Sequence, residues 1–145
     1  MISKENKLFE EVDKPEDSKI VSEDKNSGII NRESSWSGKI TGIGVFPGGI
    51  IRGRGNSTIY RNGVSISNWQ GIFTTEKGQE ITFVGKDTSK GGKNYIIRTY
   101  FTDDKDLKEL DGLVCLLDGG YDSQSNSYIC SGYKLMWGYL SKIFP

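Results

Sequence analysis

From Lys19 onward, apolar and polar residues alternate along most of the chain, which is typical of β-strands rather than helices. Glycine, proline and asparagine interrupt this alternation at short intervals, so the chain divides into short strands joined by tight turns. We therefore expect strands over residues 19–23, 28–46, 50–60, 64–76, 79–87, 93–103, 112–122 and 127–137.

Strands joined by tight turns pair as consecutive antiparallel hairpins. The strongest turn signal is Asn62-Gly63, because a type I′ turn needs positive φ at both central residues. A meander of this length closes into an up-and-down barrel, which removes the exposed edge strands that invite aggregation. The sequence therefore predicts an all-β, eight-stranded antiparallel β-barrel over residues 19–136, interrupted by a turn or two of helix at 104–111.

The N-terminal segment 1–18 is predicted to lie outside the barrel. It is polar except for Leu8, Phe9 and Val12, whose spacing suits one or two helical turns ending before Pro15. A frayed terminus is equally compatible with this composition.

The C-terminal tail 137–145 is amphipathic. Trp137, Leu140, Ile143 and Phe144 recur at helical spacing and predict a short helix with one apolar stripe. A helix this short is unstable alone, so we expect the stripe to form an interaction surface. It would cover the barrel of its own chain or dock on a second copy.

The glycine-rich stretch 44–73 allows three interpretations: a nucleotide-binding loop, a disordered RGG tract or a barrel wall. A phosphate loop needs GxGxxG or GxxxxGK[ST] between a strand and a helix, and neither pattern occurs here. An RGG tract would be flanked by disorder, whereas valine, isoleucine and tryptophan flank this stretch at strand spacing. Glycine at every second position suits close packing inside a narrow barrel, so we interpret the stretch as barrel wall.

Several motifs follow one another in a recognisable order: IRGRGNSTIY after a Pro-Gly turn, then ISNWQGIF, NYIIRTYFT and DLKELDGLVCLL. This order resembles a family of small, uncharacterised prokaryotic β-barrel proteins, in which a GxGQG strand precedes an Asp-Gly turn and a kLaxLNgvvgvFEyevD segment precedes the last strand. The resemblance covers residues 19–136 and implies a barrel of the calycin and allene oxide cyclase-like class. Asn56, Asp111 and residues 117–120 depart from the family pattern. The resemblance implies a fold and no particular activity.

The composition limits the chemistry. The 145 residues include no histidine, which removes Ser-His-Asp and Cys-His machinery and most zinc, copper and iron sites. We therefore expect no metal and no cofactor, and the sequence favours a non-enzymatic function while leaving catalysis open. Nineteen basic residues balance nineteen acidic ones, so we expect no nucleic acid or membrane partner. Cys115 and Cys130 suit free buried thiols or a cross-strand disulfide. We expect a soluble, cytoplasmic protein, because no signal peptide or membrane span is visible.

Few polar residues are placed to bind a ligand. Arg52 and Arg54 share one strand face, and Arg98 and Tyr100 share another. If these faces point into the barrel, they could hold a carboxylate-bearing molecule. If they face solvent, Ile51 and its neighbouring glycines fill the interior instead, which the alternation favours. The candidate ligand-binding residues are Arg52, Arg54, Trp69, Arg98, Tyr100 and Asp118.

Three functions remain open. The first is non-enzymatic binding of a small, largely apolar molecule inside the barrel or at one mouth, which a lumen above about 300 Å³ would favour. The second is a filled barrel, monomeric or homodimeric, that acts as a self-associating or protein-interaction module. The third is an isomerase or cyclase of the allene oxide cyclase type, which needs an ionisable residue in the lumen: Asp118, Arg98 or Tyr100.

Overall fold

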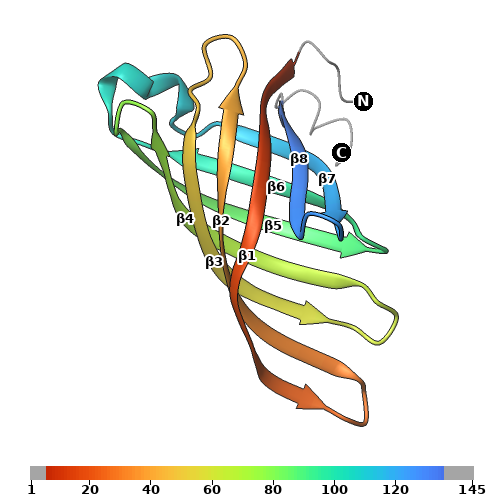
Figure 1. Cartoon of the computed structure of the whole chain (residues 1–145). Coiled ribbons are helices and arrows are strands. Elements are labelled where there is room, and N and C mark those ends of the chain that lie inside the picture. Colours follow the sequence, from red (N-terminus) through yellow and green to blue (C-terminus); the bar gives the residue numbers. More distant parts are fainter. Residues whose placement is uncertain (1–5, 136–145) are drawn as a thin grey trace, which may run out of the picture.

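The computed structural model describes residues 6–135, and its eight strands close into one antiparallel barrel in chain order (Figure 1). Each strand pairs with its neighbours in the chain, and β1 also pairs with β8. This confirms the predicted meander. The strands are β1 (Lys7–Asp24), β2 (Ile29–Gly42), β3 (Gly49–Ile59), β4 (Ser65–Thr75), β5 (Glu80–Lys90), β6 (Lys93–Phe101), β7 (Val114–Asp122) and β8 (Ser127–Lys134).

The first strand corrects the sequence-based expectation for the N-terminal segment. Residues 7–18 belong to β1, so the expected helix or frayed terminus is wrong there, and the barrel begins well before residue 19. Pairing with β2 and β8 on both sides decides the conformation of this polar segment, and such context overrides local propensity. Pro15 is tolerated because the register with β2 shifts between Pro15 and Ser18.

The predicted helical turn between β6 and β7 is confirmed as a 3-10 helix, η2 (Lys105–Leu110), whose first turn is capped by the Asp104 side chain. No helix within residues 6–135 is long and apolar enough to cross a membrane. The expected C-terminal helix, with Trp137, Leu140, Ile143 and Phe144, lies outside the described residues.

An apolar core fills the end of the barrel that carries η2. Phe46, from the β2–β3 connection, lies 4.9 Å from the Phe9 ring and stacks on Phe73 at 6.2 Å between ring centroids. Phe9, Phe73 and Tyr100 have no exposed surface, which leaves no space for water between them. The same cluster contains Ile40, Ile51, Ile81, Phe83, Leu110 and Leu117. We call this the filled end.

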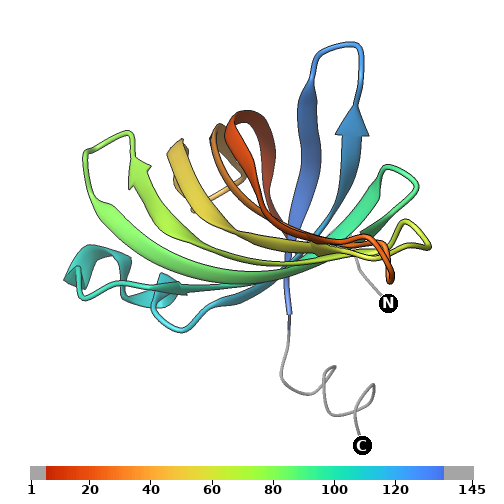
Figure 2. The same cartoon turned by 90° about the horizontal axis from the view of Figure 1, so that it is seen from below.

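The strands twist and spread apart toward the opposite end, where the β7–β8 hairpin (blue) stands clear of the other hairpins (Figure 2). We call this the wide end. Two tryptophans lie in the interior between the two ends, and each faces a glycine on the neighbouring strand. Trp36 pairs with Gly53 and Trp69 pairs with Gly55. A methyl group on either glycine would overlap the tryptophan ring opposite. The glycine-rich stretch therefore makes room for the tryptophans.

We expect Gly53→Ala to destabilise the barrel by about 1–3 kcal/mol, because the new methyl overlaps the Trp36 ring. Gly85→Ala is the matched control, since a methyl there meets no atom closer than 3.4 Å and should change stability by less than about 1 kcal/mol. Urea unfolding measures both. Equal costs for the two variants would show that the tryptophans do not need the glycine wall.

Candidate functional site

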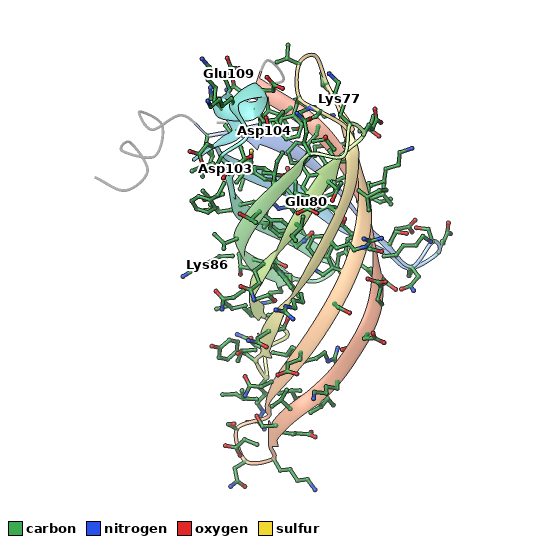
Figure 3. The ribbon with its side chains drawn as sticks, turned by 90° about the vertical axis from the view of Figure 1, so that its left-hand side faces the viewer. Lys77, Glu80, Lys86, Asp103, Asp104 and Glu109 are labelled. Atoms are coloured by element: carbon green, nitrogen blue, oxygen red, sulfur yellow. The ribbon has the colours of Figure 1, made fainter. Side chains whose placement is uncertain are left out.

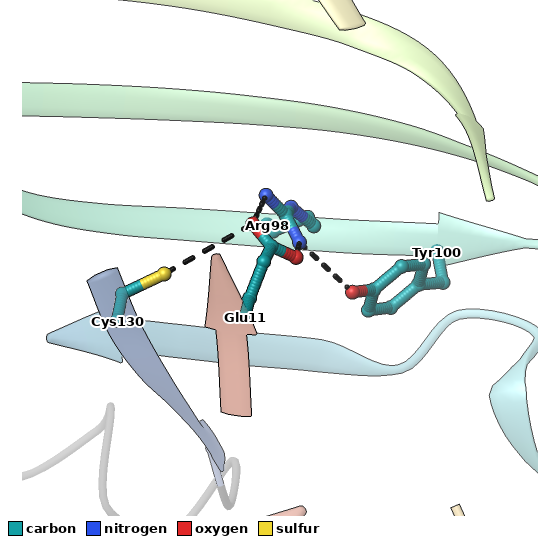
Figure 4. A network of polar contacts seen from close by, with 4 residues as sticks. All are labelled: Glu11, Arg98, Tyr100 and Cys130. Atoms are coloured by element: carbon teal, nitrogen blue, oxygen red, sulfur yellow. Dashed lines mark hydrogen bonds and ion pairs between the residues drawn. The ribbon is translucent and has the colours of Figure 1, made fainter. Parts of the chain in front are cut away.

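A buried ion pair crosses the interior of the barrel. Arg98 of β6 donates two hydrogen bonds to the Glu11 carboxylate of β1, at 2.7 and 2.9 Å, and a third at 3.1 Å to the Tyr100 hydroxyl (Figure 4). Glu11 has no exposed surface, and Arg98 is 1% exposed. The period-two alternation of β6 turns Arg98 and Tyr100 inward together.

Aromatic rings surround the guanidinium group of Arg98. Its Cζ lies 4.8 Å from the ring centroid of Phe83 and 5.9 Å from those of Trp36 and Tyr100. Such contacts stabilise a desolvated cation. Burial by itself raises the pKa of Glu11, but the charge and hydrogen bonds of Arg98 outweigh burial, so the pKa of Glu11 is lowered. The pair is therefore ionised at neutral pH.

A second carboxyl group lies beside this pair. Asp13, two residues beyond Glu11 on the same face of β1, is 6% exposed. Burial, followed by the charge and hydrogen bond of Glu11, raises the pKa of Asp13 well above its ordinary value. Asp13 is thus a neutral acid that donates its proton toward Glu11, while its Oδ1 has no partner. Gly38 makes room for the Asp13 carboxyl group, because a side chain at residue 38 would overlap that group.

The Cys130 thiol completes the set. Its Sγ lies 3.9 Å from Oε2 of Glu11, and burial raises its pKa well above the ordinary value. Cys130 and Cys115 are both free, buried thiols. Of the two alternatives that the sequence allowed, free thiols are confirmed and the disulfide is not formed. We call Glu11, Asp13, Arg98, Tyr100 and Cys130 the buried polar network.

The network is a poor fit for a metal ion. Glu11, Asp13 and Cys130 offer ligand atoms within 4.8 Å of one another. Both oxygens of Glu11 already accept hydrogen bonds from Arg98, however, so an ion there would lie next to the guanidinium group, whose positive charge repels it. Asp13 would also have to lose a proton that burial holds on it.

Toward the wide end, four aromatic side chains line the interior. Trp36 and Trp69 meet edge to face with 6.3 Å between ring centroids, and Tyr121 and Tyr128 lie 5.0 Å apart. The tryptophans are half-buried and the tyrosines are exposed. We call these four residues the aromatic mouth.

Two polar side chains of β5 and β6 lie against the aromatic mouth. Burial raises the pKa of Asp87 to about 6, although hydrogen bonds from Trp69 and Asn94 oppose the rise. Oδ1 of Asp87 and Oδ1 of Asn94 are buried and have no hydrogen-bond partner in the part of the chain that the structure describes. Burial, and then the charges of Asp87 and Tyr121, raise the pKa of the Tyr128 hydroxyl, while Arg32 opposes the rise.

The structure separates the ligand-binding residues that the sequence suggested. Arg98 and Tyr100 belong to the buried polar network, and Trp69 belongs to the aromatic mouth. Arg52 and Arg54 are exposed on the outer wall of β3 and do not approach the other candidates. Asp118 alternates with the buried Leu117 and faces outward, where it pairs with Lys93 at 3.0 Å. The expectation that Asp118 could serve inside the barrel is therefore wrong.

The outer wall is hollowed where β3, β4 and β5 run side by side. This hollow has a volume of about 700 Å³, and exposed Ile50, Ile72, Val84 and Phe101 contribute apolar surface to it. Arg52 and Arg54 line it as well. On the same face, Lys86 projects from β5 away from the barrel, and Glu80, Asp103, Asp104 and Glu109 gather near the filled end (Figure 3).

Sequence reasoning missed most of the interior polar residues. Glu11 and Asp13 lie in the segment interpreted as a tail, and no local signal marks that segment as a strand. Asp87 and Asn94 were detectable in principle, because they continue the inward phases of Gly85 on β5 and Ile96 on β6. Both residues lie near the β5–β6 turn, where the alternation alone does not show that a side chain is buried.

Comparison with solved structures shows the fold. No family model matches the sequence, and no curated protein matches it. A conserved protein of unknown function from Rhodopseudomonas palustris superposes with a TM-score of 0.75 at 12% identity, covering 90% of this chain and 96% of that one. A β-barrel-like protein from Acinetobacter baumannii gives 0.74 at 16%, covering 90% and 94%. An enzyme from Penicillium herquei gives 0.67 at 14%, covering 89% and 92%. At these identities the likeness concerns the small β-barrel fold alone.

Removing one partner of the buried pair should be costly. We expect Arg98→Met to lower the free energy of unfolding by about 3–5 kcal/mol, because the Glu11 charge is left buried and unpaired. The double variant Glu11→Leu/Arg98→Met should be more stable than Arg98→Met alone. Glu33→Gln, at the exposed Lys19–Glu33 pair, should change stability by less than about 1 kcal/mol. Urea unfolding of the four proteins tests this, and a mild effect of Arg98→Met would contradict it.

Asp87 should make stability fall with rising pH. Its pKa is about 6 in the folded chain against 3.8 ordinarily, so the folded state holds the proton more tightly. The stability gained from that proton is complete below pH 4 and is lost as pH rises through about 6. As pH rises from 4 to 7, we expect the free energy of unfolding of Asp87→Asn to increase by about 2 kcal/mol relative to that of the unmodified chain. The exposed Asp103→Asn control should show no such trend in urea unfolding across that range.

Proposed function

We propose that the chain binds a small molecule at the wide end of the barrel, with the apolar body of the molecule packed against Trp36 and Trp69. The observation that carries this proposal is a set of buried interior atoms that have no hydrogen-bond partner within residues 6–135: Oδ1 of Asp13, Asp87 and Asn94, and Nε of Arg98. Buried polar atoms are almost always hydrogen-bonded, so a cluster of unpaired ones indicates a missing partner.

The distribution of the interior residues supports this end as the binding site. The filled end is apolar and has no room for a ligand, since its largest side chains have almost no exposed surface. The interior carboxyl groups within residues 6–135 lie at the middle of the barrel and toward the wide end. Glu11, Asp13 and Asp87 all have shifted pKa values, and such shifts concentrate at functional sites.

The cost of the buried polar network also favours a role beyond stability. A barrel of this size could fill its middle layer with leucine and valine, and a buried ion pair is often no more stabilising than apolar residues of the same volume. The network gives the floor of the wide end a fixed geometry, because Glu11 is held by two hydrogen bonds from β6. A fixed floor reduces the entropy lost on binding.

The outer wall supports a second candidate function, a filled-barrel interaction module. The interior is filled at one end, and the hollow on the outer wall exposes Ile50, Ile72, Val84 and Phe101 beside Arg52 and Arg54. A homodimer that buries this face is one form of this candidate. Dimerisation that disappears in Ile72→Ser while small-molecule binding persists would favour it.

An isomerase or cyclase, which the resemblance to the allene oxide cyclase-like class suggests, is supported by Asp13. That function needs an ionisable group inside the barrel, and Asp13 is a buried neutral acid with one unpaired oxygen. A bound molecule that reaches Asp13 could therefore receive a proton from it. Binding is required before any such step, so binding at the wide end is the function we place first.

Native mass spectrometry of the protein purified from its own host tests the proposal. We expect a retained small molecule at one per chain, which Trp69→Ala loses and the outer-wall variant Ile72→Ser keeps. The spectrum reports the oligomeric state at the same time. Retention by Trp69→Ala and loss by Ile72→Ser would move the site to the outer wall. A chain that carries no molecule and binds none of the aromatic probes described below would overturn the proposal.

A further inference from the structure

We infer that the ligand of the wide end is an organic cation, a primary amine or a guanidine carrying a planar apolar group, whose N–H groups bond to Asp87 and Asn94. This inference rests on the proposed function and adds the chemical class of the ligand. It follows from the hydrogen-bonding capacity and the charge of the groups that face the aromatic mouth.

At Asp87 and Asn94 the unmet hydrogen-bonding capacity is that of acceptors, whereas the unpaired donor of the interior, Nε of Arg98, belongs to the buried polar network one layer deeper. Asn94 is 5% exposed, its side chain lowers the pKa of the neighbouring Asp87, and its Oδ1 has no hydrogen-bond partner within residues 6–135. Asp87 also receives a hydrogen bond from Trp69, yet its Oδ1 is unpaired. Both free atoms are acceptors, because an amide oxygen and a carboxylate oxygen carry lone pairs and no hydrogen. A ligand that completes them must be a donor, and it offsets about 1–3 kcal/mol of desolvation for each atom.

The charges around Asp87 favour a donor with positive charge. Both terminal nitrogens of Arg98 donate hydrogen bonds to Glu11, so the positive charge of Arg98 is balanced by Glu11 and not by Asp87. Asp13 is neutral. Arg32, half-buried on β2, acts on Tyr128 and is not among the groups that shift the pKa of Asp87. Within residues 6–135, Asp87 thus makes no ion pair.

The aromatic side chains suit the same ligand. The ring faces of Trp36, Trp69 and Tyr128 attract a cation held within about 6 Å, as the packing around Arg98 already illustrates one layer deeper. An anion would instead meet the unpaired oxygen of Asn94 and the carboxyl group of Asp87. The carboxylate-bearing ligand suggested by Arg52 and Arg54 finds no partner here, because both arginines lie on the outer wall.

Isothermal titration of the full chain with a matched series of one-ring compounds tests the inference. At pH 7.5, we expect benzylamine and benzamidine to bind at least tenfold more tightly than benzyl alcohol, and benzoate more weakly than benzyl alcohol. Quenching of tryptophan fluorescence that is reduced in Trp69→Phe and in Trp36→Phe places the binding at the aromatic mouth. All of these compounds share one ring, so the series isolates the charged group.

Proton release provides a readout that needs no variant. A cation bound to Asp87 lowers the pKa of that carboxyl group, so binding near pH 6 should release a fraction of a proton and affinity should rise by several-fold between pH 5 and 7. Titration in two buffers with different ionisation enthalpies counts the released protons. Asp87→Asn should abolish the release and reduce benzylamine affinity at least tenfold, while the outer-wall variant Asp118→Asn should keep both.

The outcomes distinguish the two proposals. Equal affinity for benzylamine and benzyl alcohol, or tighter binding of benzoate, overturns the cation inference and leaves small-molecule binding intact. Binding of benzylamine without proton release, in a folded chain, also overturns it. If no compound of the series binds and the protein from its own host carries no molecule, both proposals fail. Circular dichroism of Asp87→Asn shows whether that variant is folded, and the unmodified chain decides the question if it is not.

Discussion

The interaction on which the interior depends is the ion pair between Glu11 and Arg98. It connects β1 to β6 across the barrel rather than along a hydrogen-bonded ladder, and it is fully desolvated. Its presence determines what surrounds it: aromatic rings face the guanidinium group, and Asp13 keeps its proton because a second charge beside Glu11 would be too costly. The pair also divides the interior into the filled end and the wide end.

The glycines of the wall and the polar interior are parts of one arrangement. Gly53 and Gly55 allow two tryptophans to enter the middle of the barrel, and Gly38 allows the carboxyl group of Asp13 to lie against β2. Without these small residues, the layer that contains Arg98 would have neither its aromatic neighbours nor its second acid. Glycine weakens a strand, and here it lies where bulky or charged side chains of other strands need the space.

The sequence predicted the wall better than the site for a physical reason. Alternation and turn residues are local, so the strands from β2 to β8, η2 and the outward position of Arg52 and Arg54 could be read directly. β1 has no such local signal, because its inward positions after Phe9 are Glu11 and Asp13, which look like solvent-exposed acids. Only pairing with β8, more than a hundred residues away, makes them interior residues. The buried polar network therefore could not be assembled from local patterns.

The closure of the barrel by β1 and β8 has a consequence during synthesis. β1 is synthesised before β8. The edge of β1 that pairs with β8 therefore stays without hydrogen-bond partners while the strands between them are translated. Charged side chains on such an edge deter pairing with other chains. The acidic and lysine side chains along β1 hide the strand pattern in the sequence. The same side chains deter β1 from pairing with other chains until β8 closes the barrel.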